Sequence, residues 1–163
     1  MVEVIKINKF EELCQTASDT KVDIVTYPFT SARFKGLYCD GTIALSKDMC
    51  TDTEKACILA EELGHHYTTV GNIINQTETE NRKQERRARI WAYHKLLTLN
   101  DLIDSYKEGC QNRYEIAEHL EVTEEFLQEC IDYYREKYGL CVKQDNYIIY
   151  FEPLGVLELI SNN

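Results

Sequence analysis

Hydrophobic and polar positions along the chain change their period several times, and each change predicts a new element. Residues 8–18 (NKFEELCQTAS) place apolar side chains at helical spacing, so we expect a first helix there. Residues 21–29 (KVDIVTYPF) then alternate apolar and polar, as a half-buried strand does. Asp40 and Gly41 stand between two apolar runs. Because both central residues of a tight hairpin turn need positive φ, Asp-Gly predicts a hairpin within a small antiparallel sheet.

The middle of the chain carries helical patterns. Thr51 and Glu54 form a Thr-x-x-Glu capping box, which predicts the start of a helix that continues through KACILAEELGHHYT. A polar loop is expected at 71–81, followed by a second long helix over 82–98. The pattern stays helical over 100–138.

The end of the helical stretch has the shape of a helix-turn-helix. RYEIAEHL and EEFLQECIDYYREKY are separated by a short break, and Thr123 fits as the N-cap of the second helix. That second helix, over 124–135, has one arginine against four carboxylates, so it would be repelled from the major groove of DNA. We therefore interpret it as a packing or protein-docking lobe. LCVK and YIIYF predict a terminal hairpin, and GVLELI a last strand.

Length and charge narrow the class of protein. The 163 residues are 44% hydrophobic, which is enough for a single compact domain or for two small lobes that share a core. There are 18 Lys and Arg against 28 Asp and Glu, and the net charge of −10 argues against direct binding to nucleic acid or anionic lipid. No apolar run reaches the roughly 18–20 residues of a membrane span. Because the N-terminus also lacks the apolar core of a signal peptide, we expect a cytoplasmic protein.

The seven cysteines are odd in number and scattered, without a C-x-x-C pair. In a chain without an export signal they are expected to be reduced thiols, mostly small core residues. Neither a disulfide framework nor a zinc ribbon is predicted.

The run from Glu61 to His66 (EELGHH) is the segment that could carry chemistry. On a helix, Glu61 and His65 are four residues apart and lie on one face, so both could reach one metal ion. In the H-E-x-x-H template two histidines hold zinc and the glutamate acts as general base. That template fits with Glu62 as the base and with Glu61 in place of the first histidine. The alternative register, Glu62 with His66, would put Leu63 at the base position.

A third ligand is needed for zinc with one open position. Glu85 is the best candidate, because two antiparallel helices joined by a loop could bring it opposite Glu61 and His65. Asn81, Gln84 and His94 are less suitable. Gly64 is costly inside a helix, by roughly 1 kcal/mol against alanine, and indicates close packing against its backbone.

These residues resemble the ImmA/IrrE family of zinc metallopeptidases, also called the IrrE N-terminal-like group. The resemblance rests on LAEELGHHYTTVGNI and RKQERRARIWAYHKLL, and extends to GLYCDGTIALSKDM and to RYEIAEHLEVTEEFLQECI. It implies that Glu62 is the catalytic base and that His65 and Glu85 are zinc ligands. The family pattern is H-E-x-G-H, and this chain departs from it at Glu61.

The departure has a physical consequence. With Glu61, His65 and Glu85 as ligands, two carboxylates would neutralise the ion, so bound water would be less acidic than in a site with two histidines. We expect weaker zinc affinity, some preference for harder ions, and lower activity than in an H-E-x-x-H relative.

A basic cluster surrounds Glu85 and carries a net +4 over 82–89, in an otherwise acidic chain. It consists of Arg82, Lys83, Arg86, Arg87 and Arg89. It is either a solvated helix face or a set of charges that screen the carboxylate-rich site and bind substrate.

We therefore predict an α+β fold, with a small antiparallel sheet packed on a zincin-like metal-site helix, a helical C-terminal lobe and a terminal hairpin. Residues 1–163 are expected to form one metallopeptidase-like domain, with the sheet and metal-site helices in 1–98 and the lobe and hairpin in 99–163. Cleavage would use metal-activated water, with the edge of the 34–46 hairpin pairing with an extended peptide.

The resemblance implies that the substrate is a helix-turn-helix repressor of a phage or mobile element. The alternatives are a regulator that binds the repressor without cleaving it and, disfavoured by the acidic helix, a DNA-binding regulator.

Overall fold

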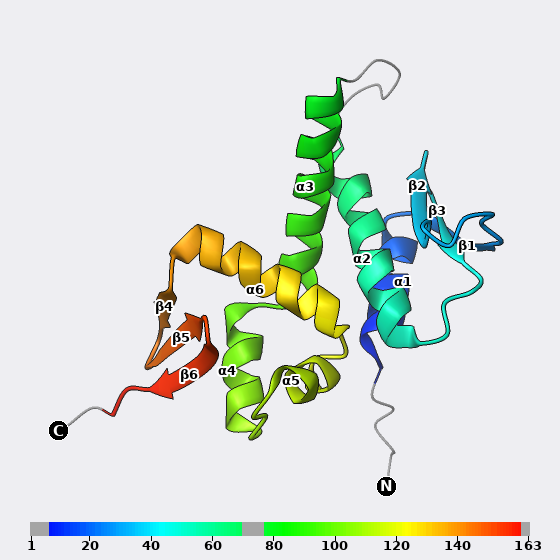
Figure 1. Cartoon of the computed structure of the whole chain (residues 1–163). Coiled ribbons are helices and arrows are strands. Elements are labelled where there is room, and N and C mark those ends of the chain that lie inside the picture. The colour runs from blue at the N-terminus through cyan, green and yellow to red at the C-terminus, as the bar shows by residue number, and fades with distance from the viewer. Residues whose placement is uncertain (1–6, 70–76, 161–163) are drawn as a thin grey trace, which may run out of the picture. The chain divides into compact units, whose positions relative to one another are not determined.

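The computed structural model describes residues 7–69 and 77–160, which form an α+β fold (Figure 1). The chain divides into two compact units, Met1–Ala92 and Tyr93–Asn163, and each is described by itself below. Within the described ranges, no helix combines the length and the apolar character that crossing a membrane requires.

The first unit begins with a helix and a three-stranded sheet. Its elements are α1 (Lys9–Asp19), β1 (Asp23–Tyr27), β2 (Gly36–Cys39) and β3 (Thr42–Ser46). Asn8 caps α1 in a capping box with Glu11. The predicted hairpin is confirmed: β2 and β3 pair antiparallel across Asp40 and Gly41, whose φ angles are 44° and 76°.

The sheet is mixed and not antiparallel throughout, which corrects the prediction. Its strand order is β1-β3-β2, and β1 pairs parallel with β3, from Asp23 opposite Thr42 to Tyr27 opposite Ser46. The chain leaves β1, passes to the far side of β3 and returns through the hairpin. Alternation of apolar residues identifies a strand but not its partner, so the sequence could not distinguish the two arrangements.

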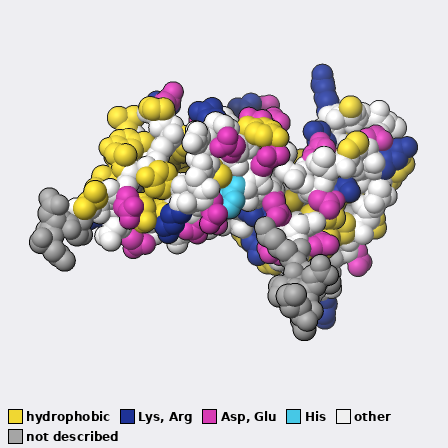
Figure 2. All heavy atoms as spheres, turned by 90° about the horizontal axis from the view of Figure 1, so that it is seen from below, with side chains coloured by type: hydrophobic (Ala, Val, Ile, Leu, Met, Phe, Trp, Pro, Cys, Tyr) yellow, Lys and Arg dark blue, Asp and Glu magenta, His cyan; other side chains and the backbone are white. Residues whose placement is uncertain are grey.

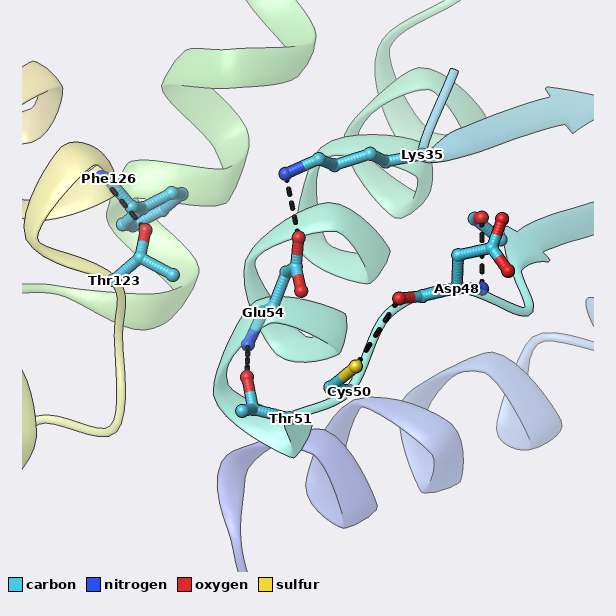
Figure 3. A network of polar contacts seen from close by, with 8 residues as sticks. Lys35, Asp48, Cys50, Thr51, Glu54, Thr123 and Phe126 are labelled. Atoms are coloured by element: carbon cyan, nitrogen blue, oxygen red, sulfur yellow. Dashed lines mark hydrogen bonds and ion pairs between the residues drawn. The ribbon is translucent and has the colours of Figure 1, made fainter. Parts of the chain in front are cut away.

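Two long helices complete the first unit, and the second of them continues into the other unit. They are α2 (Asp52–Thr68), which contacts α1, β2 and β3, and α3 (Glu78–Leu96). Thr51 accepts a hydrogen bond from the backbone of Glu54, and the side chain of Glu54 pairs with Lys35 at 2.7 Å (Figure 3). The predicted start of α2 is therefore confirmed, but only the Thr51 half of the predicted capping box is formed, since the side chain of Glu54 pairs with Lys35. The loop predicted at 71–81 falls mainly outside the described residues, and its last four residues already belong to α3.

The second unit consists of three further helices and an antiparallel sheet. They are α4 (Leu99–Lys107), α5 (Arg113–His119), α6 (Glu124–Tyr138), β4 (Cys141–Gln144), β5 (Tyr147–Phe151) and β6 (Leu154–Glu158). Thr123 caps α6, as predicted (Figure 3). The turn between α5 and α6 contains Glu121 at φ 54°. The strands pair in the order β4-β5-β6, so the predicted hairpin and last strand are both present.

All seven cysteines lie in described residues and are free thiols. The expectation that most of them are core residues is wrong, because only Cys57 and Cys130 are buried. Three are exposed, namely Cys39, Cys50 and Cys141.

Candidate active site

The residues singled out by spacing lie on the last two turns of α2. Glu61, Glu62 and His65 are all half-buried there. The helix begins at a capped residue and continues without a break through Gly64, so the i, i+4 relation between Glu61 and His65 holds in the structure.

Gly64 allows α3 to approach the backbone of α2. A Cβ at Gly64 would lie 2.3 Å from the carbonyl oxygen of Ala88, closer than any real side-chain contact. Ala88 itself is fully buried. The prediction that something packs closely at Gly64 is confirmed, and the neighbour is the backbone of α3.

This close approach brings His65 and Glu85 together. Glu85 lies about one helical turn before Ala88, and its Oε2 is 3.5 Å from Nε2 of His65. The His65 side chain is 20% exposed and that of Glu85 is 61% exposed, so the pair is open to solvent on the side of α3. Two of the three predicted ligands are therefore neighbours across two helices.

Glu62 lies against strand β2. A Cβ at Gly36 would lie 2.7 Å from Oε1 of Glu62, and the backbone N–H of Tyr38 donates a hydrogen bond to the carboxylate. Burial raises the pKa of Glu62 to about 7; the Tyr38 hydrogen bond opposes this shift, and the negative charges of Glu61 and Glu85 add to it. A carboxyl group with such a pKa can take up and release a proton near neutral pH.

The ladder between β2 and β3 explains why Glu62 finds that donor. Ser46 donates its N–H to Lys35, so alternate residues of β2 pair with β3 while Gly36 and Tyr38 direct their backbone groups to the free edge. Glu62 therefore lies at the edge of β2 where an added strand would bind.

Sequence reasoning missed Gly36 and Tyr38. The hydroxyl of Tyr38 lies 2.9 Å from Nδ1 of His66 and accepts a hydrogen bond from the backbone of Gly41 at 3.3 Å. His66 is thus engaged by β2, which favours the register that uses His65. The i, i+2 spacing of Gly36 and Tyr38 could have placed both on one face of the strand, but not against α2.

A comparison with models of protein families identifies the family to which this chain belongs. The family model of the IrrE N-terminal-like domain (Peptidase_M78) matches residues 17–131. The chain belongs to this family. The match contains Glu61, Glu62, His65 and Glu85 and ends within α6. Searches of curated proteins and of solved structures find no match.

Membership of the Peptidase_M78 family indicates metallopeptidase-like chemistry and a divalent metal. The side chains fit such an ion in donor type, because an imidazole and carboxylates are zinc ligands. They fit it in charge as well: burial is the main cause of the raised pKa of Glu62, but the negative charges of Glu61 and Glu85 add to it, and a cation would offset that repulsion. Among the described residues, however, no three His, Cys, Asp or Glu side chains converge into a ready-made site.

The basic cluster lies along the first two thirds of α3. Its five side chains are all exposed, and Arg82 pairs with Glu78 at 3.3 Å. His94, the more distant histidine, belongs to the second unit, where its Nε2 lies 3.0 Å from the hydroxyl of Tyr133.

Proposed function

We propose that this protein is a metal-dependent endopeptidase, with Glu62 as general base and with Glu61, His65 and Glu85 as the ligands of a divalent ion, zinc in the first instance. The observation that carries the proposal is the pair formed by His65 and Glu85 beside Glu62, at the point where α2 and α3 meet. A bound divalent ion would supply the positive charge that makes water acidic enough to attack a peptide carbonyl.

Side chains and backbone groups of this chain carry out the proton transfers and bind the peptide. Glu62 takes a proton from the attacking water and passes it to the amide nitrogen as the C–N bond breaks. Its raised pKa supports both transfers near neutral pH. The backbone groups of Gly36 and the carbonyl of Tyr38 face the edge of β2 and are suited to bind an extended peptide next to Glu62, which itself accepts the N–H of Tyr38.

The substrate we propose is a cognate helix-turn-helix repressor of a phage or mobile element, so that cleavage makes this protein an anti-repressor. The resemblance of the chain to ImmA/IrrE proteins supports this choice of substrate. The net charge of −10 agrees with a protein substrate, because a polyanion would be repelled. We expect the protein to act in the cytoplasm.

A second function is favoured by one specific observation. In the described part of the chain no three-ligand group is preformed, and Glu61 replaces the histidine of the family pattern. A regulator that binds the repressor without cleaving it would not need a complete metal site.

Metal analysis tests the proposal. Wild type, His65→Ala and Glu85→Ala are purified side by side, loaded with zinc, desalted and analysed by mass spectrometry for bound metal. We expect about one zinc ion per wild-type chain and a clear loss in both variants. Equal metal content in all three proteins would show that the proposed ligands are wrong. Zinc-loaded wild type that binds the repressor but leaves it intact would support the second function.

A further inference from the structure

The second unit has a pocket of about 340 Å³ that plays no part in the candidate active site. Most of its lining is apolar, with Leu102 and Tyr106 from α4, Ile116 from α5, and Leu154 and Val156 from β6. In Figure 1, β6 lies on the side of its sheet that is next to α4, and the strand order makes β6 an edge strand. The pocket therefore lies beside a sheet edge.

Backbone groups of β6 face that edge. Leu159 donates its N–H to Asn146 across the pairing with β5, and in an antiparallel ladder the paired residues alternate. It follows that Leu154 and Val156 direct their N–H and C=O groups away from β5. Within residues 7–69 and 77–160, no backbone hydrogen bond uses these groups. The same two residues contribute side chains to the pocket.

Hydrophobic side chains are also exposed around this edge. Figure 2 shows them gathered over the C-terminal strands. Leu157 is 54% exposed and Tyr106 is 43% exposed. An apolar pocket, a free strand edge and exposed apolar side chains together form the arrangement that extended peptides use when they add a strand to a sheet.

Charge indicates which peptide fits. Residues 93–163 hold six Lys and Arg against fourteen Asp and Glu, so this unit carries −8 of the net −10 of the chain. Gln111, which lines the pocket, donates its backbone N–H to Oε2 of Glu115 at 2.7 Å, so one carboxylate of this unit is hydrogen-bonded to the lining. A second copy of this chain would bring a further −8 to the same surface and be repelled.

We propose that this groove binds an extended, basic segment of a protein partner. The backbone of the segment adds to β6 as a fourth strand, one apolar side chain fills the pocket beside Tyr106 and Ile116, and Lys or Arg side chains face the acidic unit. The proposal does not depend on the peptidase function, because the pocket lies in the second unit and β6 falls outside the residues matched by the family model.

Peptide binding to the full chain tests the groove. The probe is the fluorescent peptide KTVKLKVTK, and its matched control is ETVELEVTE. We expect the basic peptide to bind, to weaken as salt is added, and to shift the amide NMR signals of Leu154, Val156 and Tyr106. N-methylation of alternate residues of the peptide should abolish binding, because it removes the donors of the added strand. Equal binding of the acidic peptide, shifts confined to other residues, or no binding of the basic peptide would overturn the proposal.

Two tyrosines of the same unit provide matched variants. Tyr106→Ala removes a wall of the pocket and should weaken binding of the basic peptide about tenfold. Tyr114→Ala removes a similarly exposed tyrosine from α5 that does not line the pocket, and should leave binding unchanged. Val156→Pro removes a donor at the free edge, where proline is tolerated, and should also weaken binding. Equal affinities of wild type, Tyr106→Ala and Val156→Pro contradict the proposal, and so does a wild-type dimer that Tyr106→Ala dissociates, since that would assign the groove to a second copy.

Discussion

The carbonyl oxygen of Ala88 lies where a side chain on Gly64 would have to begin, 2.3 Å from the position of its Cβ. Helices α2 and α3 therefore meet backbone to backbone at this point. His65 follows Gly64 on one helix, and Glu85 precedes Ala88 by about one turn on the other. The single missing methyl group of Gly64 thus sets the distance between the two ligands proposed for the metal.

Gly64→Ala should destabilise the protein, by about 2–4 kcal/mol, because the clash is with backbone that cannot rotate away. The direction of this change in stability is informative, because replacing glycine by alanine inside a helix ordinarily stabilises the protein, by roughly 1 kcal/mol. Urea unfolding measures the effect. Gly155→Ala is the control, since a Cβ there meets nothing within 4 Å. Two variants of equal stability would show that α3 does not approach Gly64 as closely as the structure has it.

Gly36→Ala should affect Glu62 more than it affects stability. A Cβ at Gly36 would lie 2.6 Å from Cγ2 of Ile58 and 2.7 Å from Oε1 of Glu62, and both of these are side-chain atoms that can move. We expect a loss of stability of about 1 kcal/mol or less. Under the proposed function, displacement of the general base should lower peptide hydrolysis by at least about tenfold. Unfolding and hydrolysis measured on the same preparation separate the two effects. Unchanged hydrolysis would mean that the position of Glu62 against Gly36 is not needed for catalysis.

Local signals in the sequence predict the local parts of the fold. Asp40 and Gly41 both adopt positive φ, as their turn chemistry requires, and Thr51 and Thr123 cap the helices that follow them. The parallel pairing of β1 with β3 was not predictable, because it depends on contacts between residues about 20 positions apart. The early start of α3 at Glu78 was missed because polar residues there show no apolar period.

In the candidate site, too, the sequence predicts what depends on one helix and does not predict contacts between distant segments. The spacing of Glu61, Glu62 and His65 on one helix follows from the period of the α-helix. Glu85 could be chosen only as a plausible partner across a loop, and the structure now places it beside His65. The contacts of Tyr38 with Glu62 and His66 come from a strand more than 20 residues earlier, and no local pattern marks them.

Glu62 should make the metal-free protein less stable as the pH rises. The pKa of its carboxyl group is about 7 in the folded chain, above its ordinary value of 4.5, so the folded state holds the proton more tightly than the unfolded state. The resulting stabilisation is complete below about pH 4.5 and is lost as the pH rises through 7. Its size is of the order of 3 kcal/mol at most.

Glu62→Gln removes this dependence, because the amide does not titrate. In the presence of a chelator, we expect the difference in unfolding free energy between pH 5 and pH 8 to shrink in Glu62→Gln, by up to roughly 3 kcal/mol. Glu108→Gln, at an exposed position, serves as the control and should behave as wild type. If wild type and both variants show the same pH dependence of unfolding free energy, titratable groups other than Glu62 cause it.

Glu61→His should increase both zinc affinity and peptidase activity. The change restores the second imidazole of the family pattern and removes one of the negative charges that act on Glu62, so the bound ion keeps more of its positive charge. We expect zinc to bind at least about tenfold more tightly, measured by competition with a chromophoric chelator, and hydrolysis of the repressor to rise with it. His66→Phe is the matched control: His66 is engaged by the hydroxyl of Tyr38, so its loss should leave the zinc content unchanged. Loss of metal in Glu61→His, or loss of metal in His66→Phe, would mean that the alternative register of the motif holds the ion.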